Sequence, residues 1–234
     1  MSDTKQASSW VDAVVFDCDG TLSQLEGIDE LARQNGVGSQ VSRLTEEAMT
    51  TTGLNEALYR QRLELVQPAL LPVIRLSELY YETRTSDIET VIRSLQVAGK
   101  EVFIVSAGIN PAVKMFGAKL GIPEESIFAV NVSFSKEGEY LDFDHHSPLV
   151  HNHGKRILVE RLRKQYPRLG YIGDGMNDFQ VKDLVTRFVG FGGHFYRENI
   201  KNQCEYYIQE PSMMSLLPLM LTSAEFDFRM PGEM

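Results

Sequence analysis

Short apolar runs recur along the chain, and a segment with helical periodicity follows each of them. The runs occupy residues 13–16, 102–105, 169–172, 187–191 and 206–208. Strands that alternate with helices pair in parallel, and helices then cover both faces of the sheet. The alternation therefore predicts an α/β fold built on a Rossmann-like parallel sheet. Because ligands bind such sheets at the carboxyl ends of the strands, the polar residues after each run are the candidate site.

The alternation stops after the first strand. Residues 25–84 contain amphipathic helical stretches and no convincing strand. This segment predicts a small helical insertion with boundaries at 24–84. Residues 1–23 and 85–234 would then form a discontinuous core domain.

Two local signals refine the elements of the core. The segment 127–143 alternates in hydropathy and has a turn signal at Glu137-Gly138, which predicts a hairpin. Ser86 and Glu89 have the spacing of a capping box and predict the start of the following helix.

Composition excludes several classes of protein. Of 234 residues, 32 are acidic and 23 are basic, and the net charge of −9 argues against binding to nucleic-acid phosphates. Two cysteines, Cys18 and Cys204, are too few for a disulfide framework. The apolar stretch 213–221 is too short to span a bilayer. We expect a cytoplasmic protein, monomeric or homodimeric, without a nucleic-acid or membrane partner.

Two acids stand at the end of the first strand. Asp17 and Asp19 are two residues apart, so the alternation of a strand would point both to one face and Cys18 to the other. Neighbouring carboxylates repel each other, and a hard dication with oxygen ligands relieves that repulsion. Asp174 follows the third strand on a glycine-flanked turn. We therefore predict a Mg²⁺ site formed by Asp17, Asp19 and Asp174, with Asp178 just behind it.

The second strand and a later helix supply a candidate phosphate site. Ser106 offers a hydroxyl, and the small residues Ala107 and Gly108 leave room before a helix whose free N–H groups would favour an anion. Lys155 adds a compact positive charge that can bind phosphate oxygens and keep an acidic nucleophile ionised.

Together these groups suit phosphoryl transfer. Asp17 is the candidate nucleophile, which would form an aspartyl phosphate. Asp19 is the candidate general acid and then general base. Ser106 and Lys155 would complete the catalytic set.

The stretches "DCDGT", "SAG", Lys155 and "GDGMND", in this order, resemble the four motifs of the haloacid dehalogenase superfamily of phosphohydrolases. Within it the chain is similar to the phosphoserine phosphatase family over nearly its full length, through "EGIDELA", "EAM", "RLELVQP" and "VGFGG". The resemblance implies magnesium-dependent hydrolysis of phosphoserine under a helical cap. It also implies that Glu26 faces the substrate ammonium and Arg62 its carboxylate, that Met49 packs against the substrate, and that Gly108 and Asn177 line the pocket.

The chain departs from that family at three positions, where Gly20, Ala107 and Asn55 replace the usual Ser, Gly and aromatic residue. Another phosphorylated amino acid or an amino alcohol therefore remains an alternative substrate. A non-catalytic phospho-ligand binder on the same scaffold is the alternative from another class.

Two further features suggest other chemistry. A cysteine-dependent phosphatase needs an arginine six residues after Cys18, where this chain has Gln24. A histidine-rich segment invites a transition-metal hypothesis, although its spacing matches no familiar zinc pattern. Its histidines are His145, His146, His151 and His153.

Overall fold

The structure is a computed structural model that describes residues 10–50 and 54–227, except the side chains of residues 47–50 and 227. A seven-stranded sheet with the order β4-β3-β2-β1-β5-β6-β7 forms its centre. Every pair is parallel except β3 with β4, so the predicted α/β fold with a parallel sheet is confirmed. The strands are β1 Ala13–Phe16, β2 Glu101–Asn110, β3 Ile127–Phe134, β4 Tyr140–Phe143, β5 Leu169–Gly173, β6 Arg187–Phe191 and β7 Tyr206–Ile208.

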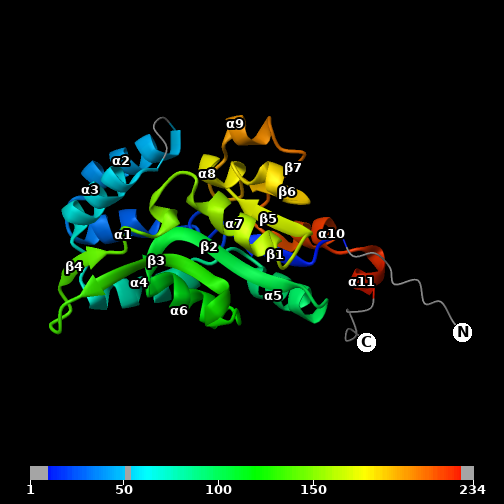
Figure 1. Ribbon diagram of the computed structural model, residues 1–234, viewed down its shortest axis with the longest axis horizontal. Helices are drawn as coiled ribbons and strands as arrows, with labels where there is room; N and C mark the ends of the chain where they lie inside the picture. The colour runs from blue at the N-terminus through cyan, green and yellow to red at the C-terminus, as the bar shows by residue number, and fades with distance from the viewer. Residues whose placement is uncertain (1–9, 51–53, 228–234) are drawn as a thin grey trace, which may run out of the picture.

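The middle strand explains why this sheet needs helices on both faces. β1 lies between β2 and β5, and all four of its side chains are buried. Such a strand is apolar on both faces, which a solvent-exposed sheet could not accommodate. In Figure 1 α5 (Ile88–Val97) and α6 (Ala112–Lys119) lie below the central strands, whereas α7 (Gly154–Arg163) and α8 (Met176–Phe179) lie above them.

Four helices follow β1 before the chain returns to the sheet at β2. They are α1 Gly27–Gln34, α2 Gly38–Thr50, α3 Glu56–Val66 and α4 Leu70–Glu82. In Figure 1 they gather at one end of the molecule, coloured blue to cyan. We treat this segment as the cap. Its last helix, α4, packs against α6 of the core, and the Tyr80 and Phe116 rings stack at 5.5 Å between centroids.

Two local expectations are wrong. Strand β2 does not end at residue 105 but runs to Asn110, with an irregular register opposite β3 between Val105 and Ile109. The Ser106–Gly108 stretch is therefore part of the irregular strand, and the helix expected after it begins at Ala112. The capping box also does not form, because α5 begins at Ile88 and the Glu89 carboxylate accepts hydrogen bonds from Tyr81 and Arg84 instead.

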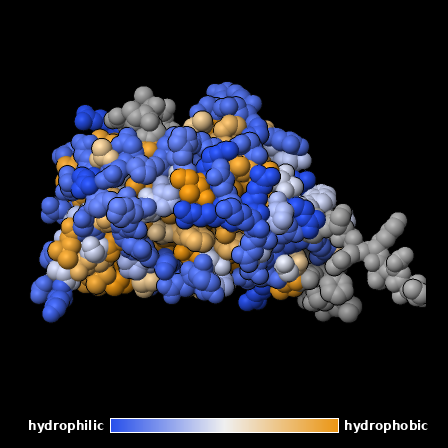
Figure 2. All heavy atoms as spheres, in the orientation of Figure 1, coloured by the Kyte–Doolittle hydropathy of each residue, from blue (hydrophilic) through white to orange (hydrophobic). Residues whose placement is uncertain are grey.

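The predicted hairpin is present as the antiparallel pair β3–β4, with Gly138 in its turn at a φ of 87°. The face seen in Figure 2 is mostly hydrophilic, and hydrophobic side chains show in its centre and around the β4 end. Leu141 of β4 and Leu71 of α4 are among the exposed apolar residues. None of the helices in the described ranges combines the length and the apolar character that a membrane crossing requires.

Candidate active site

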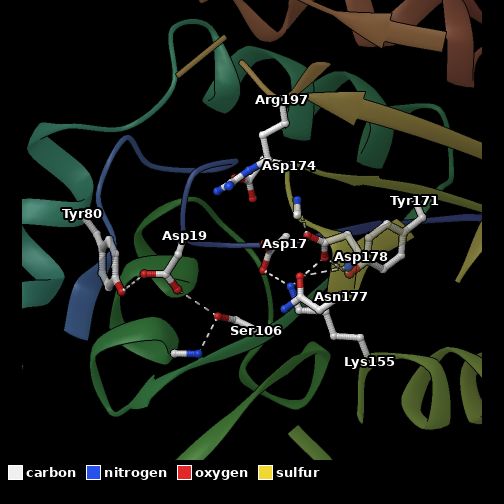
Figure 3. Close-up of polar contacts among 12 residues, drawn as sticks. Asp17, Asp19, Tyr80, Ser106, Lys155, Tyr171, Asp174, Asn177, Asp178 and Arg197 are labelled. Carbon is white, nitrogen blue, oxygen red and sulfur yellow. Dashed lines mark hydrogen bonds and ion pairs between the residues drawn. The ribbon is translucent and has the colours of Figure 1, made fainter. Parts of the chain in front are cut away.

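The sheet brings the candidate residues together at the carboxyl ends of adjacent strands (Figure 3). Asp17 follows β1, Ser106 lies in β2, and Asp174 follows β5. β1 pairs in parallel with both β2 and β5, so these three positions meet at one edge of the sheet. Lys155 enters from the first turn of α7.

Three buried carboxylates form the centre of the site. One oxygen each from Asp17, Asp174 and Asp178 lies within 4.8 Å of the others. The Lys155 Nζ atom lies 2.6 Å from Asp17 Oδ1 and 2.6 Å from Asp178 Oδ1. The Arg197 Nη2 atom lies 3.1 Å from Asp174 Oδ2. Three acids thus face two cations, and the cluster retains an excess of negative charge.

Burial and mutual repulsion shift the pKa values of the acids in this cluster. Burial and the Asp178 carboxylate raise the pKa of Asp17 well above its usual range, and Lys155 opposes this shift. Burial likewise raises the pKa of Asp174 to about 6, although Arg197 opposes the rise. Burial would lower the pKa of Lys155, but the Asp17 and Asp178 carboxylates outweigh burial and raise it. The lysine therefore remains charged between its two acids.

The cluster has the properties of a site for a hard dication. All its candidate ligand atoms are carboxylate oxygens, which suit magnesium better than a soft transition metal. A bound dication would also offset the negative charge that, after burial, raises the pKa values of Asp17 and Asp174.

The Asp19 carboxylate lies outside this cluster, contrary to the prediction. β1 ends at Phe16, so the alternation of a strand no longer sets the direction of the Asp19 side chain. Its Oδ1 atom accepts hydrogen bonds from the Gly27 N–H at 2.7 Å and the Tyr80 hydroxyl at 2.6 Å. Its Oδ2 atom accepts one from Ser106 Oγ at 3.2 Å. The two acids at the end of the first strand therefore have separate surroundings.

This arrangement changes the candidate metal ligands. Among the residues described, the acids close enough to share an ion include Asp178 and exclude the Asp19 carboxylate. Asp178 also accepts hydrogen bonds from the Tyr171 hydroxyl at 2.7 Å and the Gly175 N–H at 3.0 Å. Asp178 thus links the lysine, the acid cluster and the turn after β5.

A pocket opens between the strand ends and the cap. Asp17, Asp19, Gly108, Lys155 and Asn177 line it from the core, and Glu26 and Arg62 line it from the cap. Arg62 is buried on α3, its Nη1 lies 3.4 Å from Thr45 Oγ1, and its buried Nε has no hydrogen-bond partner. Burial and the nearby Asp19 and Asp174 carboxylates raise the pKa of Glu26 well above its usual range.

Of the remaining predicted residues, one lines the pocket, one is exposed, and one has a side chain outside the described residues. Ala107 also lines the pocket, and its carbonyl accepts a hydrogen bond from the Tyr59 hydroxyl at 3.0 Å. Asn55 is exposed and caps α3 by accepting from the Leu58 N–H, so it does not shape the pocket. Met49 belongs to α2, and its side chain lies outside the described residues.

Gly20 is constrained by its backbone and by Asp174. Its φ is 71°, a left-handed conformation, and an added Cβ would lie 2.8 Å from Asp174 Oδ2. A serine at this position, as in the family pattern, would require both the backbone and Asp174 to shift.

Sequence reasoning missed three side chains that hold the site together. Tyr80 binds Asp19, Tyr171 binds Asp178, and Arg197 binds Asp174. Tyr80 and Arg197 lie outside the four motifs and carry no spacing signal. Tyr171, by contrast, stands in an apolar strand three residues before Asp174, where a buried tyrosine needs a polar partner.

The histidine-rich segment makes different contacts. The His145 ring lies between β4 and α3, where its Nε2 is 2.8 Å from Asp142 Oδ1 and its Nδ1 is 3.1 Å from Arg60 Nη2. Its ring also contacts Phe143, with 4.0 Å between centroids. These contacts connect the hairpin to the cap.

Comparisons with known proteins agree with this geometry. The family model for haloacid dehalogenase-like hydrolases matches residues 14–181. A phosphoserine phosphatase of Bos taurus is 35% identical over 201 residues, which cover 85% of this chain and 89% of the relative. A chloroplastic phosphoserine phosphatase of Arabidopsis thaliana is 33% identical over 206 residues and is covered over 68% of its length.

Solved structures show the same similarity. A phospho-aspartyl intermediate analogue of a phosphoserine phosphatase superposes with a TM-score of 0.76 at 27% identity, covering 89% of this chain and 98% of that one. A substrate-bound phosphoserine phosphatase complex gives a TM-score of 0.75 at 27% identity with the same coverage. By its motifs, its fold and these relatives, the chain belongs to the haloacid dehalogenase-like hydrolase family, in the branch that contains these phosphoserine phosphatases.

Proposed function

We propose that this protein is a magnesium-dependent phosphoserine phosphatase, which hydrolyses O-phosphoserine to serine and phosphate. One observation carries the choice of substrate: the buried guanidinium of Arg62, with an unpaired Nε, lines the same pocket as Asp17 and Lys155. An unpaired buried polar group is costly, and a carboxylate is the ligand that a guanidinium binds best. The relatives named above act on phosphoserine, which has this carboxylate.

In the first step an oxygen of Asp17 attacks phosphorus. The bond between phosphorus and the serine oxygen breaks, and its electron pair remains on the serine oxygen. That oxygen takes a proton from Asp19, so neutral serine leaves and an aspartyl phosphate remains. Lys155, 2.6 Å from Asp17, lowers the pKa of the attacking carboxyl group and so favours its ionised form.

In the second step Asp19 acts as a base. It takes a proton from a water molecule whose oxygen attacks phosphorus, and the bond between phosphorus and Asp17 breaks. Phosphate leaves and the Asp17 carboxylate is restored. Ser106 and the backbone around Gly108 lie beside Asp19, where they can donate hydrogen bonds to phosphate oxygens.

Asp17, Asp174 and Asp178 are the residues that would hold the magnesium ion. When bound, the ion supplies positive charge that lets an anionic nucleophile approach an anionic phosphate. Lys155 and Arg197 remain in place to balance the acids that the ion does not neutralise.

Magnesium should stabilise the folded protein, and Asp174→Asn should remove most of that effect. At 100 times its dissociation constant a ligand adds about 2.7 kcal/mol to the free energy of unfolding. Only the ionised carboxylate binds the metal, and the pKa of Asp174 is about 6. The magnesium-dependent rise in Tm should therefore grow as the pH increases through 6 and shrink as the pH falls below 6. Asp183→Asn, on the exposed surface beside Arg156, is the control. An undiminished rise in the Asp174 variant would contradict the assignment.

Recognition of the amino acid would come from the cap. Arg62 would bind the carboxylate through its two-pronged fork. Glu26, whose pKa is raised by burial near other acids, would gain a favourable partner in the substrate ammonium. Both groups line the pocket that Asp17 and Lys155 also line. An amino alcohol phosphate would leave Arg62 unpaired, which favours phosphoserine over that alternative.

Arg62→Ala tests this assignment. We expect kcat/KM for phosphoserine to fall about 100-fold, since a hydrogen bond to a charged group contributes about 1.5–3 kcal/mol. For O-phosphoethanolamine, which lacks the carboxylate, the fall should stay below about threefold. Arg60→Ala removes an exposed arginine from the same helix and should change neither value. Phosphate release from both substrates is the measurement, and equal losses would remove Arg62 from recognition.

Two lesser parts of the proposal concern chemistry and location. Burial and the Asp19 and Asp17 carboxylates raise the pKa of the Cys18 thiol well above its usual range, which disfavours a cysteine nucleophile. We propose a cytoplasmic location, a reducing environment that suits the two free cysteines, Cys18 and Cys204.

A further inference from the structure

One carboxylate oxygen of Asp19, Oδ1, accepts hydrogen bonds from two donors, and both donors belong to the cap segment. The Gly27 N–H, at the start of α1, and the Tyr80 hydroxyl, on α4, both bind Oδ1. The other oxygen, Oδ2, faces Ser106 (Figure 3). The carboxyl group is therefore held at one oxygen from the cap side and presents its second oxygen to the phosphate site.

We propose that Tyr80 is a positioning residue for the reaction, which holds the Asp19 carboxyl group so that Oδ2 is the oxygen that exchanges a proton with the leaving group and with water. This inference rests on the proposed function and deepens it. Tyr80 itself touches neither substrate nor phosphate in this scheme, because it acts through Asp19.

The chemistry of the donors supports the assignment of the reacting oxygen. A backbone N–H can only donate, so the Oδ1 atom bound to Gly27 serves as an acceptor and is a poor place for a proton. When Asp19 is protonated, its proton therefore lies on Oδ2. Burial and the Asp19 carboxylate raise the pKa of Tyr80 well above its usual range, so the phenol stays neutral and donates.

The packing around Tyr80 holds its hydroxyl within hydrogen-bond distance of Asp19. The side chain is fully buried, and its ring stacks on Phe116 of the core. A Cβ at Gly27 would lie only 2.0 Å from the Tyr80 hydroxyl and 2.8 Å from its ring carbon. The absence of a side chain at Gly27 thus makes room for the hydroxyl beside the backbone N–H. Both donors reach Asp19 only because residue 27 is glycine.

Tyr80→Phe is the direct test, because it keeps the ring and removes only the hydroxyl. The measurement is the first turnover, which reports formation of the aspartyl phosphate alone. With phosphoserine we expect this rate to fall about tenfold and KM to change less than about twofold, since positioned acids contribute strongly to kcat. Acetyl phosphate releases acetate, which needs no proton, and its first-turnover rate should fall less than about twofold.

A matched control and a double variant complete the test. Tyr81→Phe removes the neighbouring hydroxyl, which binds the exposed Glu89, and should leave both rates unchanged. Because Tyr80 acts through Asp19, adding Tyr80→Phe to Asp19→Asn should cost less than about twofold more. Equal losses on both substrates, or a full tenfold loss in the double variant, would overturn the proposal.

The inference and the proposed function can fail separately. The wild-type rate on phosphoserine, measured beside O-phosphoethanolamine, tests the substrate assignment. The role of Tyr80 is tested by the first-turnover rate of Tyr80→Phe divided by that of the wild type. This ratio is measured on whichever of the two esters is hydrolysed and on acetyl phosphate. A ratio near one on the ester would overturn the positioning role even in an active phosphatase.

Discussion

Replacing Asp17 with asparagine should abolish phosphate release from phosphoserine, with a loss of at least about 10⁴-fold in kcat. An amide is a far weaker nucleophile than a carboxylate and cannot form the phosphorylated intermediate. Rapid quenching of the wild type with labelled phosphoserine should trap an acid-stable phosphoenzyme. The Asp17→Asn protein should show none.

The fold should survive this change. Burial raises the pKa of Asp17 well above its usual range, so the ionised carboxylate does not stabilise the folded state. Lys155 retains Asp178 as a partner when Asp17 is neutral. Asp12→Asn is the matched control, because Asp12 stands just before β1, at the opposite end from Asp17, and pairs with Arg168. It should leave kcat unchanged. A near-normal rate in Asp17→Asn would rule out the covalent step.

Replacing Lys155 with methionine should have the largest effect on stability. The ammonium is buried between Asp17 and Asp178, at 2.6 Å from each. Removing one partner of a buried ionic group leaves charges uncompensated and costs about 3–5 kcal/mol. Urea unfolding at pH 7 without magnesium measures this loss. Activity should vanish as well, because the nucleophile loses the positive charge that favours its ionised form.

The pH dependence of this loss follows from the sign of the shift at Asp17. An acid whose pKa is raised in the folded state costs stability in full above that pKa, and the cost declines as the pH falls from there toward the pKa of the unfolded state. Without Lys155 the pKa of Asp17 should rise further. The difference in free energy of unfolding between wild type and Lys155→Met should therefore shrink as the pH falls.

A surface lysine supplies the comparison. Lys114 pairs with the exposed Glu124, and such a pair contributes about 0–1 kcal/mol. Lys114→Met should change the free energy of unfolding by no more than that amount at any pH. A loss in Lys155→Met of the same small size would mean that the buried triad does not depend on its lysine.

Much of the site was accessible from the sequence because its signals are local. Asp17 and Asp174 follow short apolar runs, and strands β1, β5, β6 and β7 lie within a residue of the predicted bounds. Neighbouring parallel strands bring their carboxyl ends to one edge, so the meeting of these acids needs only the strand order. Lys155 joins them for the same reason, from the first turn of a connecting helix.

Other features depended on contacts that no local pattern records. The irregular register of β2 against β3 keeps Ser106 within the strand, although the apolar run in the sequence ends at residue 105. The chain leaves the sheet after Phe16, and the Cys18 carbonyl accepts the hydrogen bonds of a turn that redirects the backbone. Asp19 consequently faces Tyr80, 61 residues away, and not the acid cluster.

The sequence by itself determined the sheet, its helical insertion and the set of acids and one lysine at the strand ends, because periodicity and strand alternation act over a few residues. Only the tertiary structure determined which of these charged groups contact one another. Asp178 joins Asp17 and Asp174, Arg197 approaches from beyond β6, and the cap holds Asp19 through Gly27 and Tyr80. These choices depend on where buried charges and hydroxyls find partners, and such partners are set by distance in space, not along the chain.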